Sequence, residues 1–271
     1  MQGCMIGRRA FLAGMISSMS APLRASAALQ LMPAWAAYFE KIGTRGVVCF
    51  RKPDGSIATS DVARTKIGYL PASTFKIANA LIAMDLGVVT GADETFKWDG
   101  EVHSLGEKPI DAWNRDQSLR EAFANSTIWV FQEIARRIGK ERMAAQVSAL
   151  HYGNADITGA PIDRFWLEGN LRISAAQQID VLDRLWRGEL PLSRQAIDMT
   201  RKIMLIEQGS KGTLYGKTGW TTVQNIGWFV GVIESRGAIH PFALNMDMPT
   251  IDLAKQRIAI VKSVAADLGI F

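Results

Sequence analysis

The stretch PASTFKIANALIAMDLG, residues 71–87, marks the point where this chain changes from strand-like to helical sequence. It opens with Pro71 and small residues, continues with apolar residues at helical spacing and closes at Gly87. We therefore predict a helix from Ser73 to Leu86. The patterns of apolar residues before and after this helix differ, so the helix marks a boundary within the fold.

Strand patterns lie on both sides of a long helical region. A short helix at 33–39 and a β-hairpin, residues 46–51 and 56–60, precede the helix at Ser73. Four helical segments follow it, at 119–139, 140–150, 174–186 and 193–205. Alternation returns beyond Tyr215, at 225–233 and 241–246, before a last helix at 250–268.

These elements predict an α/β (α+β) fold. We expect an antiparallel sheet flanked by helices and built from both chain ends, with an all-helical lobe inserted between its strands. The sheet lobe is predicted at about 28–70 and 212–271, and the helical lobe at about 71–211. A single core is near its size limit at this length, so one large domain or two closely packed lobes are expected.

The composition is that of an ordinary globular protein, with 48% hydrophobic and 21% charged residues among 271. The formal net charge of +5 includes three arginines in the first 27 residues, a segment without acidic residues. The rest of the chain has 28 basic residues against 26 acidic ones and no basic cluster. We therefore expect no nucleic-acid partner.

Residues 1–27 have the layout of a cleaved signal peptide. The pair Arg8-Arg9 precedes a mildly apolar stretch at 10–21, too short for a bilayer span of about 20 residues. The string from Gly7 to Leu12 resembles a twin-arginine export signal. That pattern favours Ser or Thr in place of Gly7, which leaves the general secretion route open. We expect a periplasmic bacterial protein that is not held in the membrane.

Cysteine and histidine do not form a reactive or metal-binding cluster in this sequence. Cys4 lies in the predicted signal peptide, so Cys49 is left alone and is expected to be a small buried residue on a strand. His103, His151 and His240 are far apart, outside any metal-ligand spacing. We expect no metal site.

Ser73 and Lys76 are candidates for nucleophilic catalysis. Residues three apart on a helix share one face, so the amine can reach the hydroxyl and act as its base. The helix start also offers N–H groups to an oxyanion. The pattern S-x-x-K is weak evidence alone, because Ser73 has an alternative interpretation as a helix cap.

Three further motifs follow in an order that strengthens this interpretation. Lys217-Thr218-Gly219 precedes Trp220 at a predicted strand, where glycine permits close approach to the backbone and lysine offers a cation to a carboxylate. The others are Ser126-Thr127-Ile128 and Tyr152-Gly153-Asn154. S-x-x-K, a later serine motif and K-T-G together are typical of penicillin-recognising serine enzymes.

With these motifs and Trp166-Leu167-Glu168-Gly169, the chain resembles the class D β-lactamases, or oxacillinases. The resemblance spans the whole predicted mature sequence. Class A enzymes would have Ser-Asp-Asn at residues 126–128. One departure is Ile128, where the class D pattern more often has Val, and the extra methylene would crowd the pocket around Lys76.

The resemblance implies a covalent mechanism and the residues that perform it. Ser73 would attack the lactam carbonyl, and Lys76, carboxylated on its amine by carbon dioxide, would be the general base. Trp166 would hold this carbamate through its indole N–H, and Ser126 would relay a proton to the lactam nitrogen. No other cofactor is implied.

The resemblance also implies how the substrate is bound. The main-chain N–H groups of Ser73 and Trp220 would form the oxyanion hole. Arg257, seven residues after Thr250, would be the charged partner of the substrate carboxylate, and its alternative is a solvated helix residue. The substrate-binding set is then Lys217, Thr218, Gly219, Trp220, Arg257 and Trp113.

Three residues near these motifs have two interpretations each. Trp113 lines the substrate cleft or belongs to the core. Tyr152 is a structural neighbour of the site or a proton carrier. Glu168 is comparable to the loop glutamate of class A enzymes, but in the class D pattern it points away from the nucleophile.

We therefore expect an exported serine enzyme that hydrolyses small-molecule β-lactams. Two alternatives share the fold and the Ser73 and Lys76 pair. A penicillin-sensing domain stays acylated but is attached to transmembrane helices, and a transpeptidase or carboxypeptidase usually carries further domains. The sequence contains no pattern that specifies an oligomeric state.

Overall fold

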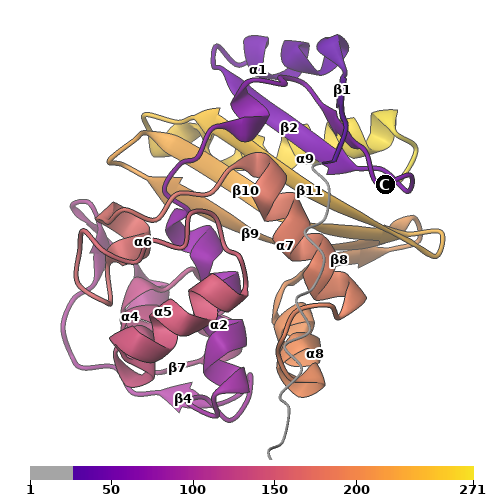
Figure 1. Cartoon of the computed structure of the whole chain (residues 1–271). Coiled ribbons are helices and arrows are strands. Elements are labelled where there is room, and N and C mark those ends of the chain that lie inside the picture. The colour runs from indigo at the N-terminus through magenta and orange to yellow at the C-terminus, as the bar shows by residue number, and fades with distance from the viewer. Residues whose placement is uncertain (1–26) are drawn as a thin grey trace, which may run out of the picture.

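The computed structural model describes residues 27–271 and centres on one seven-stranded sheet with helices on both faces (Figure 1). The strand order is β1-β3-β2-β11-β10-β9-β8. In chain order the strands are β1 (Leu29–Leu31), β2 (Gly46–Arg51), β3 (Ile57–Thr59), β8 (Leu205–Gly209), β9 (Gly212–Thr221), β10 (Ile226–Ser235) and β11 (Ala238–Asp247).

The sheet confirms the predicted antiparallel architecture built from both chain ends. Strands β9, β10 and β11 pair antiparallel, and the β2–β3 hairpin adds to them where Val48 lies opposite Leu244. Strand β1 is an exception, because it runs parallel to β3. Strand β8 was not predicted, and its first residue was placed in a helix. All five of its residues are exposed, so they carry no alternation that would reveal a strand.

The two faces of the sheet bury two apolar clusters. Val47 and Cys49 of β2 face the cluster that includes the helical lobe and α7 (Ala175–Arg187). Val48 and Phe50 face the other cluster, with α9 (Gln256–Asp267). This alternation follows from the two-residue period of a strand. Cys49 is buried as predicted, and burial raises the pKa of its thiol to about 11.

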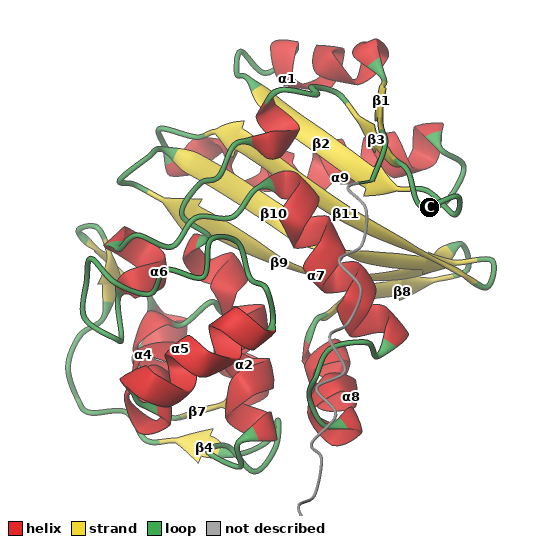
Figure 2. Cartoon of the chain, viewed as in Figure 1, coloured by secondary structure: helices red, strands yellow, loops and turns green. Residues whose placement is uncertain are grey.

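The helical lobe packs beside the sheet and contains most of the remaining helices (Figure 2). They are α2 (Lys76–Asp85), α3 (Leu119–Ala124), α4 (Ile128–Ile138), α5 (Lys140–Ala149), α6 (Phe165–Glu168) and α8 (Arg194–Ile203). The short helix α1 (Ala37–Glu40) and the 3₁₀ turns η1 (Pro33–Ala36), η2 (Arg64–Lys66), η3 (Ala72–Phe75), η4 (Asp111–Trp113) and η5 (Ile251–Lys255) complete the set.

The lobe differs from its predicted all-helical form in two ways. It also carries two small antiparallel pairs, β4 (Thr95–Phe96) with β7 (Gln117–Ser118) and β5 (Ser104–Leu105) with β6 (Lys108–Pro109). Two-residue strands are too short to show a period. The helix predicted at 119–139 is broken between α3 and α4, where Ser126 has a left-handed φ of 58°.

The predicted signal peptide, including Arg8-Arg9, lies outside the described residues except for Ala27. Within residues 27–271, no helix is long and apolar enough to cross a membrane.

One buried hydrogen bond joins the sheet to the segment that begins the helical lobe. Trp228 of β10 donates its indole N–H to the carbonyl of Leu70 at 2.9 Å. We expect Trp228→Phe to lower the free energy of unfolding by about 1–3 kcal/mol, because a buried acceptor loses its partner. Urea titration would measure this change.

The matched control is Trp35→Phe, which makes the same truncation at a buried indole whose N–H has no hydrogen-bond partner within residues 27–271. Equal losses in the two variants would mean that the hydrogen bond contributes nothing beyond packing.

Candidate active site

Ser73 and Lys76 are brought together by the turn that starts the first helix of the lobe. Ser73 lies in η3 and Lys76 is the first residue of α2. The Lys76 Nζ is 2.8 Å from the Ser73 Oγ, with the amine as donor. Ala72, directly before Ser73, has a φ of 48°, a conformation that alanine rarely adopts. Such strain often occurs where a side chain must be aimed for function.

The Lys76 amine lies in an apolar pocket. Its side chain is fully buried, and Nζ is 5.3 Å from the centre of the Phe131 ring. Burial is the main reason that the pKa of Lys76 lies well below 10.5, and the positive charge of Lys217 lowers it further. A neutral amine beside the Ser73 hydroxyl can act as a base.

Trp166 of α6 forms another wall of this region. Its ring stacks on Phe75, with 5.6 Å between ring centres, and its side chain is fully buried. The indole Nε1 has no hydrogen-bond partner among residues 27–271. An unpaired buried N–H is costly, so this group is available for an acceptor that enters the pocket.

Ser126 lies in the break between α3 and α4. Its backbone N–H bonds to the carbonyl of Phe123 at 3.2 Å, and the Phe123 ring centre is 5.7 Å from the Nζ of Lys217. Phe123 also contacts Phe131 edge to face at 6.3 Å. The two phenylalanines therefore connect the surroundings of Ser126, Lys217 and Lys76.

Strand β9 places the Lys217-Thr218-Gly219 motif beside the Ser73 turn. A Cβ on Gly219 would lie 3.1 Å from the carbonyl oxygen of Pro71 and 3.2 Å from the backbone nitrogen of Thr74. A side chain at this position would require the Ser73 turn to shift by a few tenths of an ångström, so glycine favours this close approach. Trp220, next on β9, is half-buried and donates its indole N–H to the carbonyl of Met248 at 2.8 Å.

Lys217 and Arg257 place two buried cations close together at this strand. Lys217 is only 4% exposed, and burial followed by the charge of Arg257 lowers its pKa to about 7. Arg257 of α9 is 7% exposed and donates through Nη1 to the carbonyl of Gly219 at 2.5 Å. Burial lowers the pKa of Arg257 to about 10. The solvated alternative for Arg257 is therefore excluded, and the two cations suit a carboxylate ligand.

Known proteins share both this sequence and this fold. Residues 52–268 match the family model described as the penicillin-binding protein transpeptidase domain. The β-lactamase OXA-48 of Klebsiella pneumoniae is 42% identical over 236 residues, which cover 85% of this chain and 86% of the relative. The class D β-lactamase YbXI from Nostoc has a TM-score of 0.83 at 39% identity and covers 88% of this chain and 99% of its own. This chain belongs to the class D β-lactamases.

A second solved structure supports the assignment. The class D β-lactamase FUS-1 (OXA-85) from Fusobacterium nucleatum subsp. polymorphum has a TM-score of 0.83 at 33% identity, and the match covers 89% of this chain and 100% of that structure. Within residues 27–271 of this class D β-lactamase, no group of three or more metal-binding side chains is found.

Trp113, Tyr152 and Glu168, for which the sequence left two interpretations each, lie in different surroundings. Trp113 is 5% exposed and donates its indole N–H to the carbonyl of Asn125 at 2.9 Å, so it packs directly behind the Ser126 segment. Tyr152 is buried, which raises the pKa of its phenol. Glu168 is exposed and forms an ion pair through two hydrogen bonds with Arg164, the residue directly before its short helix.

Phe123, Phe131 and Gln117 were not singled out from the sequence. Phe123 and Phe131 lie over the two lysines, and Gln117 and Thr127 bond to each other beside Ser126. Thr127 lies inside a motif that was quoted, but nothing in the spacing indicates its partner ten residues earlier. The phenylalanines have ordinary helical core spacing.

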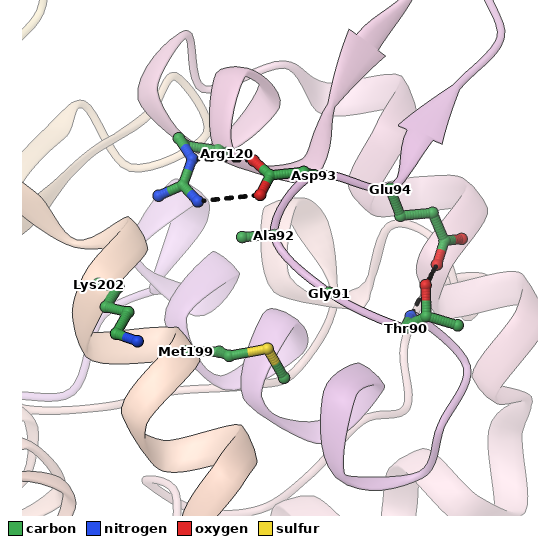
Figure 3. Close-up of a pocket in the computed structure, with 8 residues that line it drawn as sticks. All are labelled: Thr90, Gly91, Ala92, Asp93, Glu94, Arg120, Met199 and Lys202. Carbon is green, nitrogen blue, oxygen red and sulfur yellow. Dashed lines mark hydrogen bonds and ion pairs between the residues drawn. The ribbon is translucent and has the colours of Figure 1, made fainter.

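A separate hollow of about 540 Å³ is lined by residues 90–94, by Arg120 of α3 and by Met199 and Lys202 of α8 (Figure 3). None of the predicted site residues lines it. Arg120 is paired with Asp93 at its rim, and Met199 forms part of its wall (Figure 3). This hollow is therefore distinct from the region that contains the predicted site residues.

We expect Lys217→Met to stabilise the class D β-lactamase at neutral pH. The pKa of Lys217 is about 7 in the folded state and 10.5 ordinarily, so between these values the unfolded chain binds more protons here. Each pKa unit corresponds to about 1.4 kcal/mol. The free energy of unfolding at pH 7 should therefore rise by up to about 5 kcal/mol in this variant.

This gain should shrink as the pH approaches 10.5, and urea titrations across that range would measure it. Lys202→Met, at an exposed lysine, is the matched control and should show no such pH-dependent gain. A gain in the Lys217 variant that stays constant with pH would contradict the assignment to the buried amine.

Proposed function

We propose that this class D β-lactamase hydrolyses β-lactam antibiotics through an acyl-enzyme on Ser73. The observation that carries the proposal is the contact of 2.8 Å between the Ser73 hydroxyl and the fully buried Lys76 amine. A buried amine whose pKa lies well below 10.5 is the base that a serine nucleophile requires.

In acylation, Ser73 Oγ bonds to the lactam carbonyl carbon and its proton passes to the base at Lys76. The main-chain N–H groups of Ser73 and Trp220 lie on the adjoining η3 turn and β9 strand and would hold the oxyanion. The carbon–nitrogen bond of the lactam then breaks, and Ser126 gives its hydroxyl proton to the departing nitrogen while it takes up the Ser73 proton from the base at Lys76, which leaves that base free to activate water. Water attacks the resulting ester with the help of the same base and releases Ser73.

The substrate carboxylate is assigned to the cationic end of β9. Lys217 and Thr218 are neighbours on β9, and Arg257 bonds to the carbonyl of Gly219 on the same strand. Because Lys217 and Arg257 are buried close together, an anionic ligand relieves their mutual repulsion. The carboxylate of a penicillin or cephalosporin has the required charge.

The pocket also fits carboxylation of Lys76 by carbon dioxide. The reaction requires a neutral amine, and the lowered pKa of Lys76 supports that state. The product is an anion that needs hydrogen-bond donors when buried, and the Trp166 Nε1 is an unpaired buried donor. When attached, the group would supply a carboxylate oxygen as the general base.

A sensor or a transpeptidase is the second candidate function, since the transpeptidase model matches residues 52–268. Such proteins acylate with β-lactams but release the product slowly. The relatives named as class D β-lactamases cover most of the chain and favour turnover.

Incubation with a chromogenic cephalosporin should give many turnovers per molecule of protein. With a slowly hydrolysed β-lactam, mass spectrometry should show one added ligand mass. Ser73→Ala should abolish both results, because it removes the nucleophile, while Ser60→Ala, at a buried serine that only bonds the backbone of Val48, is the matched control. A single stoichiometric burst would support the sensor or transpeptidase, and an adduct that persists in Ser73→Ala would remove Ser73 from its role.

Bicarbonate should restore activity that is lost in degassed buffer at about pH 6, where amine protonation opposes carboxylation. Trp166→Phe keeps a ring but deletes the N–H, so this variant should need more bicarbonate for the same rate. Carbon-13 NMR with labelled bicarbonate should show a carbamate resonance that Lys76→Met lacks. Trp35→Phe serves as the control for loss of a buried indole. Full activity without bicarbonate in both wild type and Trp166→Phe would leave Lys76 as a plain amine base.

We place the mature enzyme in the bacterial periplasm. The proposal is supported by the signal-like pattern of residues 1–27, with Arg8-Arg9 ahead of its apolar stretch. β-Lactams act on the cell wall, so an enzyme in that compartment meets its substrate before the target does.

A further inference from the structure

We propose that Gln117 is a positioning residue for Ser126. Its side-chain oxygen holds the residues on both sides of Ser126, and through them it maintains the backbone conformation that aims the serine hydroxyl at the lactam nitrogen. This inference rests on the proton-relay role proposed for Ser126.

The Ser126 backbone is in a conformation that needs external support. Its φ of 58° is in the left-handed region, which serine rarely adopts. Residues in such conformations persist only where surrounding contacts hold them, and they are concentrated at functional sites. The Ser126 hydroxyl itself makes no hydrogen bond within residues 27–271 and is half-buried. The side chain is therefore aimed by its backbone alone.

Main-chain hydrogen bonds and the Trp113 indole also hold this backbone, but the side chains on both sides of Ser126 bond to Gln117. Its Oε1 accepts a hydrogen bond of 2.7 Å from the Thr127 hydroxyl and a longer one of 3.4 Å from the Asn125 amide. Gln117 is 1% exposed and Thr127 is fully buried, so water does not compete for this pair. Strand β7 holds Gln117 in place by pairing it with Phe96 of β4.

Stability alone does not explain an amide at this position. The Nε2 of Gln117 is buried and has no hydrogen-bond partner among residues 27–271, which destabilises the folded state. A leucine at 117 with a valine at 127 would fill similar space without polar groups. Gln117 is therefore less favourable for stability than an apolar residue, but its side chain can orient the hydroxyl of Thr127.

The test is the double variant Gln117→Leu with Thr127→Val, which removes both polar partners and leaves neither unpaired. Stopped-flow kinetics with a chromogenic cephalosporin would measure acylation and deacylation separately. We expect acylation to slow about tenfold or more, because misplacement of a catalytic group by about 1 Å can cost a hundredfold. Deacylation and the melting temperature should stay close to wild type, since Ser126 acts on the departing nitrogen.

Thr127→Ser is the matched control, because it keeps the hydroxyl and should retain wild-type acylation. Unchanged acylation in the double variant would overturn the proposal. Equal slowing of acylation and deacylation with a lowered melting temperature would also overturn it, because that result describes a purely structural pair.

Ser126→Ala distinguishes failure of this inference from failure of the proposed relay. If Ser126→Ala slows acylation but the double variant does not, the role of Gln117 alone is wrong. If Ser126→Ala acylates at the wild-type rate, the relay is wrong and the positioning role is wrong with it.

Discussion

The burial of a lysine amine next to a serine hydroxyl is the constraint on which the rest of this structure depends. In water the amine of Lys76 would be charged and useless as a base. The apolar rings around it, with Phe131 on one side and the stacked pair Phe75 and Trp166 nearby, remove that water. The pocket therefore prefers a neutral amine or an anion bonded to the free indole N–H of Trp166.

The sheet contributes the other residues of the site, because strand β9 packs against the turn that carries Ser73. Gly219 on β9 permits contact between strand backbone and the Ser73 turn, and Trp228 on β10 bonds to Leu70 just before that turn. Arg257 then attaches α9, on the other face of the sheet, to the carbonyl of Gly219. The cations proposed to bind the substrate and the serine proposed to attack it are thus placed by different layers of one fold.

Several local features of the site oppose stability. Ala72 and Ser126 have left-handed backbones, Lys217 is a buried cation whose pKa is lowered to about 7, and the Trp166 Nε1 is unpaired. Ser126, Lys217 and Trp166 are themselves proposed to act in catalysis or binding, and Ala72 directly precedes Ser73. Such destabilising features are common at active sites, where a group must be oriented or kept reactive, and packing elsewhere in the protein compensates for the lost stability. In this protein the compensating stability comes from burial of the two apolar clusters on the faces of the sheet.

The sequence by itself determined the elements and the chemical groups, because both are encoded locally. The spacing of apolar residues, with prolines and glycines at the ends of elements, located the long strands and most helices, and the motif at Ser73 supplied the proposed nucleophile and base. The exposed strand β8 and the break at Ser126 were missed, since neither has a local period. Only the tertiary structure decided that Gln117 bonds Thr127 and that Arg257 is buried against Gly219. Those contacts join residues on different elements, 10 and 38 positions apart in the sequence, and their energy comes from burial that exists only after the chain has folded.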